Sequence, residues 1–145
     1  IVGFENDKVI VHRLGGIAIE QIQAVCDVEV VLQLSHAEPT APGQLKSHYA
    51  TKKLLLQGDV RENLSHHTGK KVGILSFKTN YSVSNSIEHV LSPDGDLSEA
   101  ASGLFSAMRS LDQSDVEIIL AEFFPDEGLG KAINDRLARA AYPIK

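Results

Sequence analysis

The sequence predicts an α/β fold: a small Rossmann-like layered sheet, largely parallel, with helices on both faces, preceded by a β-rich segment. Two observations predict it. Short apolar runs of buried-strand length alternate with stretches in which apolar residues recur at steps of three and four, as in amphipathic helices. Strands that alternate with helices favour a parallel sheet, because a parallel pair needs a crossover that is usually helical.

The first 34 residues predict a hairpin followed by a helix and a further strand. The runs 1–4 and 9–11 are β-rich and flank turn residues at 5–7. After the break at Gly15-Gly16, apolar residues from Ile17 to Val25 predict a short helix, and 28–34 is again β-rich. Cys26 continues the helical apolar pattern and is expected to be buried. Because the chain opens inside strand-like material without Met, we expect a piece of a longer protein.

Residues 35–51 have the composition of a linker, with Pro39, Pro42 and Gly43. The same segment carries a cation, a titratable imidazole and an aromatic hydroxyl, at Lys46, His48 and Tyr49. Such a set suits contact with a phosphate and stacking near a base. From the residues alone, the favoured interpretation is a linker that merely bears polar side chains.

Residues 52–145 predict the α/β domain itself. Its expected strands are 54–56, 72–77, 87–91 and 116–121, and a short helix is expected at 59–66. Apolar residues from Leu97 to Leu111 predict a helix of about four turns, which Asp96 and Glu99 begin in a capping-box arrangement. A last helix is predicted from Leu129 to Ala141.

Composition and charge exclude several classes of protein. The net charge of −5 and pI near 5.6 give no general electrostatic footprint for nucleic acid. No apolar run approaches the ~18 residues of a membrane span, and the one cysteine allows neither a disulfide framework nor a thiolate zinc cluster. We therefore expect a cytoplasmic protein without a membrane partner.

The remaining motifs favour structural roles. The neighbouring His66 and His67 point about 100° apart on a helix, so they predict an exposed helix end rather than a metal site. The 94–96 segment, Asp-Gly-Asp, lacks the rest of a calcium loop, and 128–130, Gly-Leu-Gly, lacks the third glycine of a dinucleotide fingerprint. No nucleotide P-loop, esterase or zinc-protease motif is present, so no catalytic set is predicted.

Three segments together resemble a known family. They read APGQLKSHYA at 41–50, SPDGDLSEAASGLFSAMRSLD at 92–112 and AEFFPDEGLGKAINDRLARAA at 121–141. They look like the linker and C-terminal accessory domain of two-domain threonylcarbamoyl-AMP synthases of the YrdC-type translation-factor family. VIVHRLGGI at 9–17 is similar to the closing strand of that family's catalytic domain. Leu14 and Thr51 depart from the family pattern, which commonly has Pro or Glu, and Pro, at these places.

The resemblance implies that 1–34 is the end of a YrdC catalytic domain whose larger, preceding part is missing here. The parent enzyme would join ATP, L-threonine and bicarbonate with the help of magnesium, for threonylcarbamoylation of adenosine 37 in tRNA. Arg13, Lys46, His48 and Tyr49 would contact the nucleotide, the linker acting as a gate across the catalytic cavity. This chain alone would hold no cofactor and be inactive, and it would meet tRNA only indirectly.

Two alternatives stay open. In the first, a ligand-sensing module binds a metabolite or nucleotide at the carboxyl edge of the sheet, where Glu122, Asp126 and Glu127 cluster. The residues alone favour a structural role for those carboxylates, near the amino end of the next helix. In the second, a tRNA-docking domain uses a local basic face, formed by Lys46, Lys52, Lys53, Lys70 and Lys71.

Overall fold

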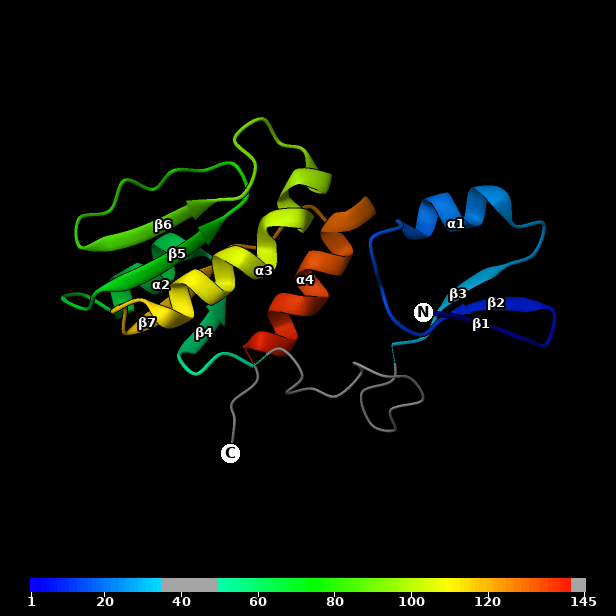
Figure 1. Cartoon of the computed structure of the whole chain (residues 1–145), viewed down its shortest axis with the longest axis horizontal. Coiled ribbons are helices and arrows are strands. Elements are labelled where there is room, and N and C mark those ends of the chain that lie inside the picture. Colours follow the sequence, from blue (N-terminus) through cyan, green and yellow to red (C-terminus); the bar gives the residue numbers. More distant parts are fainter. Residues whose placement is uncertain (35–49, 142–145) are drawn as a thin grey trace.

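Two β-sheets organise the part of the chain that the computed structural model describes, residues 1–34 and 50–141 (Figure 1). The first sheet contains β1 (Val2–Glu5), β2 (Lys8–Val11) and β3 (Val30–Leu32), in the order β1-β2-β3. The antiparallel β1–β2 hairpin turns through two residues with positive φ, Asn6 at 50° and Asp7 at 57°, as a primed hairpin turn requires. The predicted hairpin is confirmed.

Strands β2 and β3 are parallel and are joined by the short helix α1 (Ile19–Val25). Cys26 ends this helix as its C-cap and is half-buried, so the prediction of a buried core cysteine is wrong. The helix stops there because the Cys26 backbone is extended, which turns the side chain off the apolar stripe. We call residues 1–34 the N-terminal unit.

The second sheet holds β4 (Leu54–Gln57), β5 (Val72–Ser76), β6 (Ser86–Val90) and β7 (Ile118–Ala121). All neighbouring pairs are parallel, in the order β4-β7-β5-β6. The predicted layered parallel sheet is therefore correct, with strand ends shifted by one or two residues. We call residues 50–141 the C-terminal domain.

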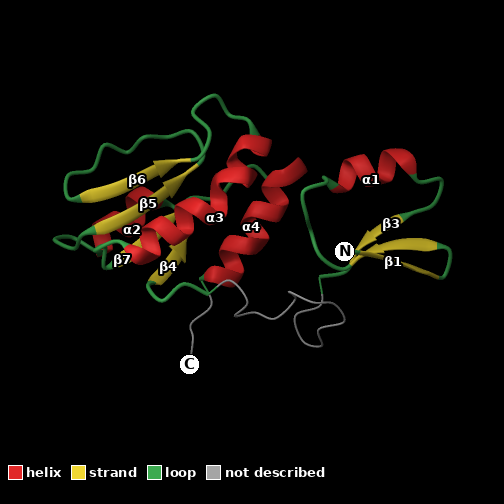
Figure 2. Cartoon of the chain, in the orientation of Figure 1, coloured by secondary structure: helices red, strands yellow, loops and turns green. Residues whose placement is uncertain are grey.

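Helices cover both faces of this sheet (Figure 2). Helices α3 (Leu97–Gln113) and α4 (Gly128–Ala140) pack on one face, with Ile119 and Ala121 in their core cluster. Helix α2 (Val60–His66) covers the other face, with Ile118 and Leu120. Adjacent residues of β7 thus enter opposite cores, so the strand is apolar throughout, as expected for a parallel sheet buried on both sides.

The start of α3 differs from the predicted capping box. Asp96 accepts a hydrogen bond from the Ser98 backbone N–H at 2.7 Å, but Glu99 does not return to the cap. Instead the fully buried Ser92 donates its hydroxyl to Glu99 and accepts from the Asp96 N–H at 2.7 Å. A relay through Ser92 replaces the direct reciprocal pair, because that hydroxyl lies between the two groups.

No helix in the described ranges, 1–34 and 50–141, is long and apolar enough to cross a membrane.

Candidate functional site

Of the four predicted nucleotide-contacting residues, Arg13 belongs to the described part of the chain. It lies in the loop after β2 and lines a cavity of about 300 Å³ within the N-terminal unit. The rest of the lining is largely apolar, including Val11, Ile17 and Ile22. Lys46, His48 and Tyr49 lie outside the described residues, so their predicted contacts stay predictions.

Backbone contacts tie the Arg13 loop to the start of β1. The Ile1 amino group donates to the Arg13 carbonyl at 2.8 Å, and the Arg13 N–H donates to the Ile1 carbonyl at 3.3 Å. The next residue, Leu14, is buried, whereas the guanidinium-bearing side chain before it is half-buried. The loop therefore contributes Arg13 to the lining of the cavity and Leu14 to the buried core.

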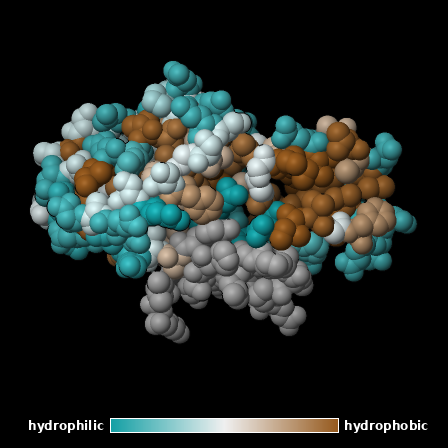
Figure 3. All heavy atoms as spheres, viewed as in Figure 1, coloured by the Kyte–Doolittle hydropathy of each residue, from teal (hydrophilic) through white to brown (hydrophobic). Residues whose placement is uncertain are grey.

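The N-terminal unit exposes large apolar side chains. Phe4 is 69% exposed, Ile17 63% and Val25 83%. The space-filling view shows hydrophobic side chains gathered over much of this unit (Figure 3). Larger exposed apolar surfaces are typical of sites that bind another protein, a membrane or a ligand. We call it the N-terminal apolar surface; its exposed members are Ile1, Val2, Phe4, Ile17, Val25 and Leu32.

A second cavity, of about 380 Å³, lies between the N-terminal unit and the C-terminal domain. Leu14, Leu32 and Leu34 line it from one side, and Phe123 and Asn134 are among the residues that line it from the other. Asn134 is fixed in place, since its amide accepts from Gln57 and the Phe124 N–H and donates to the Phe124 carbonyl. The wall contributed by α4 is thus rigid.

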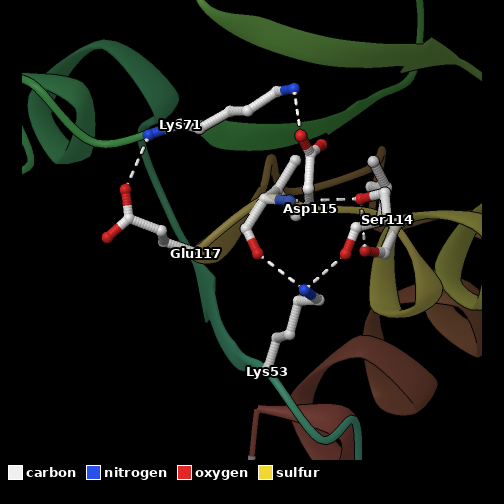
Figure 4. A network of polar contacts seen from close by, with 7 residues as sticks. Lys53, Lys71, Ser114, Asp115 and Glu117 are labelled. Atoms are coloured by element: carbon white, nitrogen blue, oxygen red, sulfur yellow. Dashed lines mark hydrogen bonds and ion pairs between the residues drawn. The ribbon is translucent and has the colours of Figure 1, made fainter.

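Lys53 fixes the chain where it enters the C-terminal domain (Figure 4). Its ammonium donates to the carbonyls of Ser114, at 2.6 Å, and Val116, at 2.7 Å. Its backbone N–H donates to Asp112 at 3.0 Å. These acceptors lie at and after the carboxyl end of α3, where the helix dipole and unpaired carbonyls favour a cation. The segment after the predicted linker is therefore anchored firmly.

The carboxyl edge of the second sheet is occupied by structural contacts. Glu122 accepts from the Phe77 backbone N–H and, at 2.9 Å, from the Tyr81 hydroxyl. Burial and this hydrogen bond raise the pKa of Tyr81 to about 12. The other two predicted carboxylates, Asp126 and Glu127, are exposed. Glu122 thus connects the end of β7 to the loop after β5. Because its carboxylate is engaged in these bonds, the ligand-sensing alternative is disfavoured.

The basic face of the tRNA-docking alternative is partly neutralised. Lys53 binds main-chain carbonyls, and Lys71 pairs with Asp115 at 2.7 Å, an ion pair that lowers the pKa of Asp115. Lys52 and Lys70 are exposed. Lys46 lies outside the described residues. Among the four described members of this face, two exposed lysines are weak support for binding a polyanion.

The His66 side chain is exposed at the end of α2 and the half-buried His67 is the C-cap, as predicted for a helix end. Within residues 1–34 and 50–141, no group of three His, Cys, Asp or Glu side chains is placed to hold a metal ion.

The comparisons with known proteins decide the family. The model of the family described as threonylcarbamoyl-AMP synthase, C-terminal domain, matches residues 17–142. The chain belongs to this family. The match begins at residue 17, within the N-terminal unit, and continues through the predicted linker and the whole C-terminal domain. The resemblance drawn from the three sequence segments is confirmed.

Two similar proteins carry the same name as the family. The threonylcarbamoyl-AMP synthase of Bacillus subtilis is 35% identical over 97% of this chain, and that of Pyrococcus abyssi is 31% identical over 89%. The chain spans 44% and 41% of the length of these relatives. A crystal structure of P. abyssi Sua5 complexed with L-threonine has a TM-score of 0.74 at 26% identity, over 92% of this chain and 42% of that one.

Sequence reasoning missed the residues that hold the site together. The sequence predicts Lys53 only as part of a basic face. It predicts no contact for Lys131 or Ala132 of the family segment GLGKAIND. A signal was available in the glycines of that segment. Gly128 has φ of +50°, and a Cβ on Gly130 would lie 1.9 Å from the Pro125 carbonyl oxygen. Such crowding marks a helix start under tight spatial constraint.

Proposed function

We propose that this chain is the linker and accessory domain of a threonylcarbamoyl-AMP synthase. The complete enzyme would convert ATP, L-threonine and bicarbonate into threonylcarbamoyl-AMP, for the threonylcarbamoylation of adenosine 37 in tRNA. The family match supports this proposal, as does the fact that the chain spans less than half of its named relatives. In such an enzyme the tRNA would be an indirect partner.

The N-terminal apolar surface carries the proposal. Burying a large apolar side chain is worth about 1.5–3 kcal/mol, and Phe4, Ile17 and Val25 forgo most of this gain in the isolated chain. The occupant that fits is the preceding part of the same catalytic domain, because residues 1–34 form a three-stranded sheet that leaves Val2 and Phe4 of its β1 strand exposed. That part would contain the threonine and ATP pockets and would bind the magnesium that accompanies ATP.

The predicted linker would then gate the nucleotide pocket. Leu34 leaves the N-terminal unit and Lys53 is anchored in the C-terminal domain, so 35–51 joins two folded parts. A loop suits this role because a gate must move, while the folded domain supplies its fixed end. In the proposed closed state, Lys46, His48 and Tyr49 approach the nucleotide together with Arg13, and water is excluded from the reactive carbamoyl intermediate.

Replacing both His48 and Tyr49 by Ala in the complete protein tests the gating role. The rate of threonylcarbamoyl-AMP formation should fall by about tenfold or more, since each residue would lose a contact to the nucleotide. The measurement is adenylate formation from labelled threonine, with ATP affinity determined in parallel. Lys52→Ala is the matched control, because Lys52 directly follows the linker and is exposed. Unchanged rate and unchanged ATP affinity in the double variant would refute the gate.

A further inference from the structure

The family segment GLGKAIND forms the contact between the C-terminal domain and the N-terminal unit. It spans residues 128–135, in the first two turns of α4. Lys131 donates to Glu20 of α1 at 2.8 Å, and this bond lowers the pKa of Glu20 and raises that of Lys131. Because half of the Glu20 side chain is exposed, the ion pair adds little to the stability of the fold. Its main effect is to orient α1 relative to α4.

The apolar part of the contact is next to the ion pair. Ala132 is buried to 3% exposure in one cluster with Val11 and Leu14. Half-buried residues of the N-terminal unit, Ile19 and Ile22 of α1 among them, pack around this cluster. Ala132 is therefore the residue of α4 that belongs to the core of the other unit rather than to the core of its own domain.

Leu14 connects this contact to Arg13. The two residues are neighbours in one loop, and both line the 300 Å³ cavity, while Leu14 also reaches the cavity between the two units. Gly15 and Gly16 follow, and a Cβ on either glycine would meet nothing within 4 Å. The Ile1 backbone bonds hold one side of this loop. On the other side, two adjacent glycines with open space around them have little rigidity, so the geometry there depends on the buried Leu14.

We propose that Ala132 and Leu14 are positioning residues: α4 of the C-terminal domain holds the loop that carries Arg13 and thereby sets the geometry of the cavity that Arg13 lines. This inference rests on the proposed function for the role of Arg13 toward nucleotide, but the holding contact itself is a property of the chain. The accessory domain would then influence the nucleotide pocket through the contact between α4 and the Arg13 loop, in addition to the linker.

Hydrogen exchange of the complete protein tests the holding contact. Ala132→Glu puts a carboxylate into the Val11–Leu14 cluster, and we expect exchange of the 12–17 amides to rise about tenfold or more. Exchange in β5 and β7 should stay unchanged, because Ala132 is outside their core clusters. Ala24→Glu is the control, since Ala24 is exposed on α1 and the same charge there should leave 12–17 unchanged.

Leu14→Ala provides a second route to the same result, because it removes the buried side chain from the loop without adding a charge. It should also raise exchange at 12–17 while leaving α3 unchanged. If Ala132→Glu unfolds the chain, Leu14→Ala decides. Unchanged exchange at 12–17 in Leu14→Ala would overturn the proposal, whatever the activity of the complete enzyme.

The same variants in the complete enzyme separate this inference from the proposed function. Ala132→Glu should raise the KM for ATP several-fold with a smaller change in kcat, in the direction of an Arg13→Ala variant. Faster exchange together with a raised KM supports both proposals. If exchange is faster in Ala132→Glu and Leu14→Ala but the KM for ATP is unaltered in these two variants and in Arg13→Ala, the holding contact is supported. The nucleotide role of Arg13 is then overturned.

Discussion

Gly130 and Gly103 both lie in helices of the C-terminal domain but differ in the space around them. A Cβ on Gly130 would come within 1.9 Å of the Pro125 carbonyl oxygen, a backbone atom with little freedom to move. A Cβ on Gly103, in α3, would meet Leu91 at an ordinary 3.7 Å. We therefore expect Gly130→Ala to lower the free energy of unfolding by about 1–3 kcal/mol or more, through overpacking at the start of α4.

Gly103→Ala is the matched comparison, because alanine is the better helix former. It should raise the free energy of unfolding by about 0.5–1 kcal/mol. Urea unfolding of both variants followed by circular dichroism measures the difference. Equal effects of the same sign would contradict the assignment of Gly130 to a crowded backbone contact.

Tyr81 predicts a dependence of stability on alkaline pH. Its folded pKa of about 12 lies above the ordinary value of 10.0, because burial and the Glu122 hydrogen bond disfavour the phenolate. The unfolded chain thus loses this proton first. The stabilisation is complete below pH 10 and declines as pH rises from 10 toward 12. Absorbance titration should show one phenol that ionises last, and Tyr81→Phe should remove it; a wild-type curve with all phenols near 10 would exclude the shift.

At the scale of elements, Lys53 joins the start of β4 to the end of α3. Replacing it by Met keeps the aliphatic stem but leaves the Ser114 and Val116 carbonyls without their cation. We expect a loss of about 1–3 kcal/mol in the free energy of unfolding, the usual cost of losing hydrogen bonds to a charged group. The exposed neighbour Lys52 gives the control, since Lys52→Met should change stability by less than about 0.5 kcal/mol. Similar losses for both lysines would contradict the anchor.

Element types followed from the sequence because each strand and helix has one dominant local pattern. The apolar run of β7 and the three-and-four spacing of α3 are unambiguous, and both elements were predicted in type and near their ends. The predictions for Cys26 and for the α3 capping box are wrong. The position of Cys26 depends on the extended backbone at the end of α1, and the start of α3 depends on the Ser92 hydroxyl. Pattern rules describe neighbours along the chain and do not place such partners.

The site was less accessible to sequence reasoning for the same reason. Arg13 was named through family resemblance, but its surroundings depend on Ala132, which is more than one hundred positions away. No periodicity relates these two segments. The crowded glycines of α4 mark the contact region, yet only the tertiary arrangement shows that the helix start meets the N-terminal unit.

At the scale of the whole molecule, the two units of the chain differ in completeness. The C-terminal domain encloses apolar cores on both faces of its sheet and exposes Leu54, Phe105 and Phe123. The smaller N-terminal unit exposes Ile1, Val2, Phe4, Ile17, Val25 and Leu32. Because its sheet is covered on both faces, the C-terminal domain is suited to hold the linker and the Arg13 loop in place. The exposed apolar side chains of the N-terminal unit fit a partner surface, which the proposed preceding part of the synthase would supply.

The most direct test of this account is ATP-dependent formation of threonylcarbamoyl-AMP, measured side by side for the complete protein and for the 145-residue chain at equal concentration. The account predicts product from the complete protein and none from the chain, because Arg13 and the linker act on a pocket built by the preceding part. Formation of the adenylate by the 145-residue chain alone would contradict it.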